Sequence, residues 1–82
     1  MNTFNEDLEN AQLEVVAREG ATDNPRYIIE AAIEAYDAVN YRHFRTPLTL
    51  GEGGNDAKLL ARFIGRCLDN SGYQLTRTNP PA

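Results

Sequence analysis

The chain has 82 residues, a hydrophobic fraction of 41%, a charged fraction of 24% and a formal net charge of −4. These values are typical of one small globular domain and exclude a disordered chain. No apolar run approaches the ~18–20 residues that span a bilayer, and the acidic start lacks the pattern of a signal peptide. Because the single cysteine, Cys67, cannot form an internal disulfide, we expect a protein of the reducing cytoplasm.

A first helix is predicted to begin at Phe4. Thr3 and Glu6 have the T-x-x-E spacing of a capping box, in which each side chain satisfies a free backbone N–H of the other residue. Apolar residues then recur at helical intervals, with Leu8 and Val15 among them. Gly20 is well placed to end this helix.

A second helix is predicted from Asn24-Pro25, where Asn24 can cap the helix and proline suits the first helical position. The helical pattern covers residues 27 to about 41. Its apolar arc is wide, so we expect the central and most buried helix of the fold. The remaining face carries an acidic stripe: Glu30, Glu34 and Asp37.

A third helix is predicted from about residue 55 to 69, after a connection that contains Pro47 and three glycines. Its apolar face comprises Leu60, Phe63, Ile64, Cys67 and Leu68. A basic stripe lies beside that face at i, i+4 and i+8: Lys58, Arg62 and Arg66.

The C-terminal part is predicted to form a short strand. Residues 70–72 are a good helix stop, and residues 73–77 alternate as a strand does. Since a lone strand leaves its backbone unpaired, this one would pair with residues 48–50 or with a second subunit. The predicted fold is therefore mainly α, with three helices and a short C-terminal strand in one domain over residues 1–78, followed by a flexible tail at 79–82.

Charge is divided unevenly along the chain. Residues 1–41 carry nine acidic and two basic side chains, whereas residues 42–82 carry three acidic and six basic side chains. The acidic and basic stripes could therefore pair with each other inside the fold, where exposed ion pairs set register more than stability. Alternatively the two faces meet partners, and the acidic stripe could imitate a phosphate backbone.

The glycine-rich segment before the third helix raises the question of phosphate binding. It lacks the G-x-x-x-x-G-K-[ST] pattern of a P-loop and the third glycine of a dinucleotide fingerprint. Glu52 and Asp56 flank the helix start and would repel an anion. A flexible helix entrance is the favoured interpretation, and the alternative is an anion site formed by Gly53, Gly54, Lys58 and Arg62.

No catalytic or metal-binding motif is evident. Cys67 falls on an apolar helix face, where a thiol behaves as a small hydrophobe. One histidine, His43, and no cysteine pair argue against structural zinc. We therefore expect neither enzyme activity nor a cofactor.

The segment around the end of the second helix is the best candidate for binding. Tyrosine and arginine are enriched at interface hot spots, and they cluster here. The candidate partner-binding residues are Tyr41, Arg42, Phe44 and Arg45, with Tyr73 and Arg77 as an extension.

These observations favour a non-enzymatic protein-interaction module. It would be a small regulator or inhibitor of bacterial or phage type that binds a larger macromolecule and forms a homo-oligomer. The first alternative is a binder of an anionic ligand such as a nucleotide, at the glycine-rich segment. The second is a nucleic-acid binder that uses the basic half, which the net charge of −4 disfavours.

Overall fold

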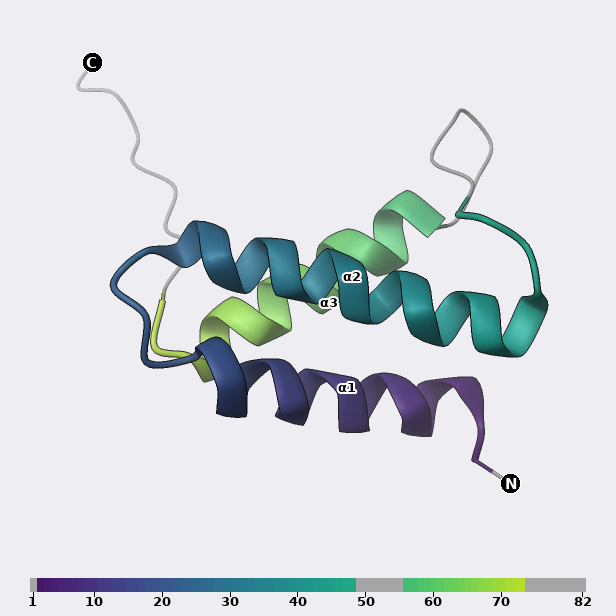
Figure 1. The fold of residues 1–82 in the computed structure, drawn as a ribbon, viewed down its shortest axis with the longest axis horizontal. Coiled ribbons are helices and arrows are strands. Elements are labelled where there is room, and N and C mark those ends of the chain that lie inside the picture. Colours follow the sequence, from purple (N-terminus) through teal and green to yellow (C-terminus); the bar gives the residue numbers. More distant parts are fainter. Residues whose placement is uncertain (1, 49–55, 74–82) are drawn as a thin grey trace, which may run out of the picture.

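A computed structural model of the chain describes residues 2–48 and 56–73, and these residues form three α-helices. Helix α1 comprises Phe4–Glu19, α2 comprises Pro25–Phe44 and α3 comprises Asp56–Asn70. Helices α1 and α2 run antiparallel, and α3 crosses both obliquely (Figure 1). Each helix packs against the other two. The prediction of three helices in a mainly α fold is confirmed for the described residues.

Helix α1 begins where its capping box predicts. The Thr3 hydroxyl accepts a hydrogen bond from the Glu6 N–H at 3.1 Å, and the Glu6 carboxylate accepts one from the Thr3 N–H at 3.3 Å. The helix ends at Glu19, and the Gly20 N–H donates to the Val16 carbonyl at 2.8 Å. Gly20 keeps a right-handed conformation there, with φ −63°.

Helix α2 begins as predicted but ends three residues later than expected. The Asn24 side chain accepts from the Arg26 N–H at 3.0 Å, and Pro25 occupies the first turn. The helix continues to Phe44 because no residue before Pro47 breaks it. Its buried side chains outnumber those of α1 or α3, which confirms its central position: Ile28, Ala31, Ala32, Tyr36, Val39 and Asn40.

The core lies between the three helices and is aromatic at one end. Val15, Ile28, Tyr36 and Cys67 are the largest fully buried side chains. The Tyr36 ring contacts Phe4 of α1 edge-on, with centroids 6.0 Å apart, and Phe63 of α3 at 5.8 Å. Tyr36 thus joins all three helices, and such aromatic pairs stabilise packing beyond the area they bury.

Helix α3 ends in a Schellman motif. The Tyr73 N–H donates to the Leu68 carbonyl at 2.9 Å, and the Gly72 N–H donates to the Asp69 carbonyl at 3.1 Å. Gly72 adopts φ +91°, the left-handed conformation that this motif requires. The predicted stop at residues 70–72 and the predicted apolar face of α3 are confirmed, with Ile64 only partly buried.

The predicted C-terminal strand is not confirmed, since the described residues contain no strand. Tyr73 completes the end of α3 instead, and its hydroxyl donates to the Thr22 carbonyl at 2.6 Å. Residues 74–77, the pairing partners at 49–50 and the tail at 79–82 lie outside the described residues. Within the described ranges, no helix is long and apolar enough to cross a membrane.

Candidate protein-interaction surface

The last turn of α2 presents two aromatic side chains to solvent. Tyr41 and Phe44 are each 54% exposed, although both are large and apolar. Arg42 and Arg45 flank them and are exposed too. We call these four residues the terminal patch. It combines the two side-chain types that dominate interface hot spots.

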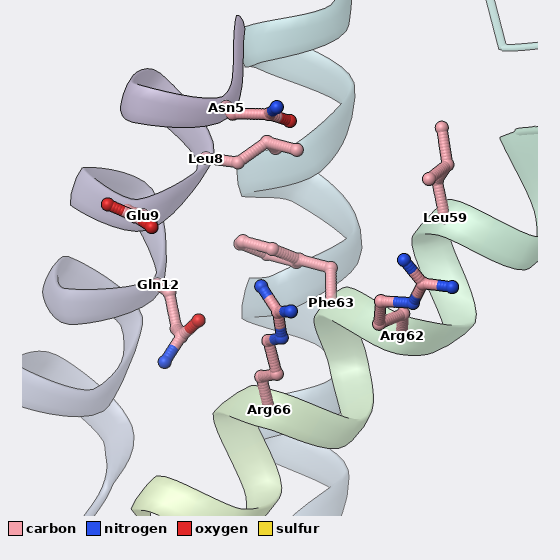
Figure 2. Close-up of a pocket in the computed structure, with 8 residues that line it drawn as sticks. All are labelled: Asn5, Leu8, Glu9, Gln12, Leu59, Arg62, Phe63 and Arg66. Carbon is pink, nitrogen blue, oxygen red and sulfur yellow. The ribbon is translucent and has the colours of Figure 1, made fainter.

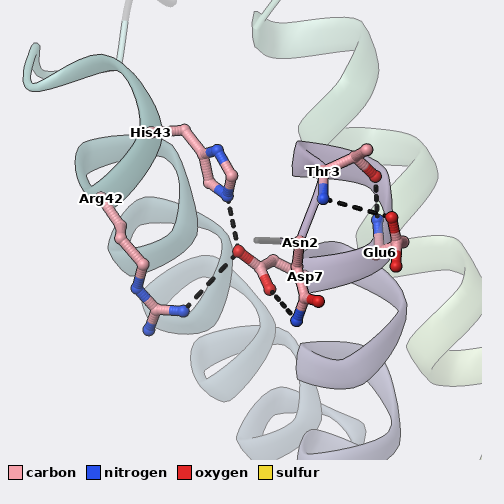
Figure 3. A network of polar contacts seen from close by, with 6 residues as sticks. All are labelled: Asn2, Thr3, Glu6, Asp7, Arg42 and His43. Carbon is pink, nitrogen blue, oxygen red and sulfur yellow. Dashed lines mark hydrogen bonds and ion pairs between the residues drawn. The ribbon is translucent and has the colours of Figure 1, made fainter.

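Below the terminal patch, a polar network centred on Asp7 ties α2 to the start of α1 (Figure 3). The Asp7 carboxylate contacts His43 Nε2 at 2.5 Å and Arg42 at 3.8 Å, and it accepts a hydrogen bond from the Asn2 amide at 3.1 Å. Its side chain is only 12% exposed. The hydrogen bond from His43 and then that from Asn2 hold the pKa of Asp7 below its ordinary value of 3.8.

An aromatic contact fixes the inner side of the terminal patch. The Phe44 ring meets Phe4 with centroids 5.1 Å apart and an interplanar angle of 63°. Phe4 also contacts His43 at 5.6 Å and reaches into the core through Tyr36. Phe44 is therefore held by one side while the other faces solvent.

Arg45 ends α2 in a conformation that arginine rarely adopts. Its φ of +58° and ψ of +24° are left-handed, and its N–H donates to the Tyr41 carbonyl at 2.8 Å. Glycine is the usual residue at this position because it lacks the Cβ that clashes there. The amide of Asn40, only 3% exposed, donates to the Thr46 carbonyl at 3.1 Å and holds the chain just beyond.

The structure does not bring Tyr73 to the terminal patch. Tyr73 binds Thr22, which precedes the N-terminus of α2, whereas Tyr41 lies in its last turn. A helix of 20 residues is about 30 Å long, so the two tyrosines lie at opposite ends of the fold (Figure 1). The idea that Tyr73 extends the patch is therefore corrected. Arg77 lies outside the described residues.

The acidic and basic stripes form no ion pair with each other among the described residues. Glu30 pairs with Arg26 of its own helix at 3.0 Å. Glu34 lines a groove between α1 and α2, whereas Arg62 and Arg66 line a different groove between α1 and α3. The two stripes thus face different surroundings, and the interpretation that they set the register of α2 and α3 has no contact to support it.

The α1/α3 groove, of about 300 Å³, is a second surface feature (Figure 2). Its lining residues are Asn5, Leu8, Glu9, Gln12, Leu59, Arg62, Phe63 and Arg66. Of these, the sequence pattern singled out Arg62 for the anion site, and Arg62 and Arg66 as members of the basic stripe. Leu59 lies off the predicted apolar face of α3. In the sequence, an apolar residue off that face indicates an exposed apolar side chain.

The anion-binding and nucleic-acid alternatives gain no support from the described residues. Gly53 and Gly54 lie outside the described residues, and Asp56 occupies the first turn of α3, beside the exposed Lys58. The basic residues are also divided. Arg42 contacts Asp7 at the end of α2, whereas Arg62 lies in the α1/α3 groove. A continuous phosphate-binding footprint would need them on one surface.

The side chains of Cys67 and His43, which could act in catalysis, lie in different parts of the fold. Burial raises the pKa of Cys67 to about 11, so the thiol stays protonated near neutral pH. Cys67 is buried in the core, while His43 is engaged with Asp7 at the end of α2. Within residues 2–48 and 56–73, no group of three His, Cys, Asp or Glu side chains could hold a metal ion.

Comparisons with protein-family models, with curated proteins and with solved structures give no significant match. A functional inference for this chain therefore depends on the geometry of its own side chains.

Proposed function

We propose that this chain is a non-enzymatic protein-interaction module, a small cytoplasmic regulator or inhibitor that binds a larger protein through the terminal patch. The observation that carries the proposal is the exposure of Tyr41 and Phe44 side by side on the last turn of α2, each at 54%. Two half-exposed aromatic rings together with two exposed arginines have the composition of an interface centre.

The contacts and the backbone conformation of the terminal patch residues strengthen the proposal. Phe44 packs on Phe4, so its ring is oriented before a partner arrives. Arg42 lies 3.8 Å from the Asp7 carboxylate and stays exposed for a partner. Arg45 keeps a left-handed backbone where glycine would fit better. Unfavourable backbone conformations of this kind cluster at functional sites, because binding gives a reason to keep the side chain.

A cross-linking experiment tests the proposal with a matched control. A photoreactive phenylalanine analogue is placed at Tyr41 and, separately, at Tyr27, which is 53% exposed at the opposite end of the same helix. Irradiation in the native cell should link position 41 to one defined protein, identified by mass spectrometry. Position 27 should not give that product. Equal labelling from both positions, or none from position 41, would contradict the proposal.

A binding experiment with the purified partner then measures the contribution of the terminal patch. Replacement of Tyr41, Arg42 and Arg45 by alanine should weaken binding by about 2 kcal/mol or more, roughly 30-fold, as expected for hot-spot residues. Thermal unfolding should change little, since the side chain of Tyr41 is exposed and the Arg42 ion pair is long. Replacement of Tyr27 by alanine is the control and should leave affinity unchanged.

A further inference from the structure

The α1/α3 groove is longer than its central hollow. A second hollow, lined by Glu9, Gln12, Leu13, Arg66 and Asn70, adjoins the first and shares three lining residues with it. The groove therefore follows α1 for about two turns, from Asn5 to Leu13, with α3 as its other wall. Helix α2 lies behind its central hollow (Figure 2). An elongated groove between two helices is the shape that accepts a third helix.

Apolar side chains from both α1 and α3 line this groove. Leu8 and Phe63 form its floor, and Phe63 is 4% exposed. Leu13 is 65% exposed and Leu59 is 37% exposed, and both line the groove. Leu13 and Leu59 therefore remain partly uncovered in the isolated chain, and a ligand with an apolar face could bury them.

The α3 wall is positively charged and unpaired. Lys58, Arg62 and Arg66 recur every four residues, so they lie on one face of α3, and Arg62 and Arg66 line the groove. None of the three forms an ion pair or hydrogen bond among the described residues. Glu9 supplies a single carboxylate to the opposite wall. A groove with an apolar floor and one cationic wall is complementary to a helix that carries acidic and apolar residues together.

We infer that the α1/α3 groove binds an acidic amphipathic helix of a partner protein. Two carboxylates one turn apart would face Arg62 and Arg66, and neighbouring apolar side chains would cover Leu8, Leu13 and Leu59. This inference rests on the proposed binding function for its biological setting, but it requires no contribution from the terminal patch.

A second copy of the chain fits the groove less well. The acidic stripe of α2 lies beside the 40% exposed Ile33 and has suitable chemistry, but α2 packs behind the groove of its own chain (Figure 2). Copies joined through these two surfaces would associate head to tail, and such contacts do not close into a symmetric dimer. A small anion is also disfavoured, because it would face Glu9 and leave the apolar floor uncovered.

The test uses a designed helical peptide with two glutamates one turn apart beside two leucines, and a control peptide with glutamine at both positions. Titration followed by NMR should move the signals of Leu8, Leu13 and Phe63 with the acidic peptide. Arg62→Gln with Arg66→Gln should weaken binding about tenfold, and added salt should weaken the native complex. Arg18→Gln with Arg26→Gln makes the same charge change on other surfaces and should have no effect.

Three results would overturn the inference: no binding of the acidic peptide, equal binding of the glutamine peptide, or an affinity for the acidic peptide that is unchanged when Arg62 and Arg66 are replaced. Sedimentation would also reject a partner helix if it showed self-association that depends on Arg62 and Arg66. That result would assign the groove to a second copy of the chain. Tyr41→Ala with Arg45→Ala should leave peptide binding intact. Failure of the groove is thereby distinguished from failure of the terminal patch.

Discussion

The carboxylate of Asp7 lies 2.5 Å from Nε2 of His43, and this contact joins the first turn of α1 to the last turn of α2. The two residues are 36 positions apart in sequence. The contact sets the position of the helix end that carries Tyr41 and Phe44. The polar network under the terminal patch is thus part of the patch's support.

This network should make stability depend on acid pH. The pKa of Asp7 is lower in the folded chain than its ordinary value of 3.8, chiefly because of the hydrogen bond from His43. The folded state therefore favours the ionised carboxylate, and the resulting stabilisation is present above pH 3.8 and lost as pH falls through the folded pKa. Thermal unfolding of the native chain and of Asp7→Asn should differ at pH 6. The difference should shrink below pH 4, and a constant offset would contradict this assignment.

Arg45→Gly should stabilise the fold. The left-handed conformation at φ +58° costs an L-residue about 1–2 kcal/mol, and glycine removes that cost. Glycine also makes the unfolded chain more flexible, which offsets about 0.4–1 kcal/mol. Urea unfolding should therefore show a net gain of roughly 0.5–1 kcal/mol. Arg42→Gly, inside α2, is the control and should lose about 1 kcal/mol. A loss at position 45 would mean that its side chain stabilises the fold.

The local determinants of the fold could be predicted from sequence. The capping box at Thr3, the Asn24-Pro25 start and the stop near Gly72 all depend on neighbouring residues, and each is confirmed. The sequence predicts the end of α2 at about residue 41, but no helix-breaking residue precedes Pro47 and the helix continues to Phe44. The alternation over residues 73–77 predicts a strand, whereas the backbone of Tyr73 completes the end of α3.

Contacts between distant segments could not be predicted. Nothing near His43 in the sequence indicates that Asp7 will reach it, because this depends on the antiparallel packing of α1 against α2. The α1/α3 groove likewise arises only when two helices meet. The sequence holds two signals for it, since Leu13 lies off the apolar stripe of α1 and Leu59 lies off that of α3.

Tyr36→Phe should leave the fold as stable as the native chain or more stable. The Tyr36 side chain is fully buried, and its hydroxyl has no hydrogen-bond partner among the described residues. An unpaired buried hydroxyl costs about 1–3 kcal/mol, so its removal should raise the free energy of unfolding by up to that amount. Tyr36→Ala should lose about 3–5 kcal/mol through the cavity it leaves. Destabilisation by phenylalanine in urea unfolding would show that the hydroxyl is paired.

Cys67 should be inert in the folded chain. Its thiol is fully buried, and burial raises its pKa to about 11 from an ordinary value of 9.0. The folded state favours the protonated thiol, so the associated stabilisation is complete below pH 9 and is lost as pH rises toward 11. A thiol reagent at pH 8 should react only after denaturant is added. Rapid reaction of the native chain would contradict the buried position of the thiol. Cys67→Ala, which has no thiol, is the control for nonspecific reaction of the reagent.

The two glycines of the α3 region should respond to alanine in opposite directions. Gly65 lies inside α3, and a Cβ added there would meet no atom within 4 Å. Alanine has the higher helix propensity, so Gly65→Ala should add up to about 1 kcal/mol to stability. Gly72 has φ +91° in the Schellman motif, so Gly72→Ala should lose about 1 kcal/mol or more. Urea unfolding of the two variants measures both effects, and equal responses would contradict the end of α3 described here.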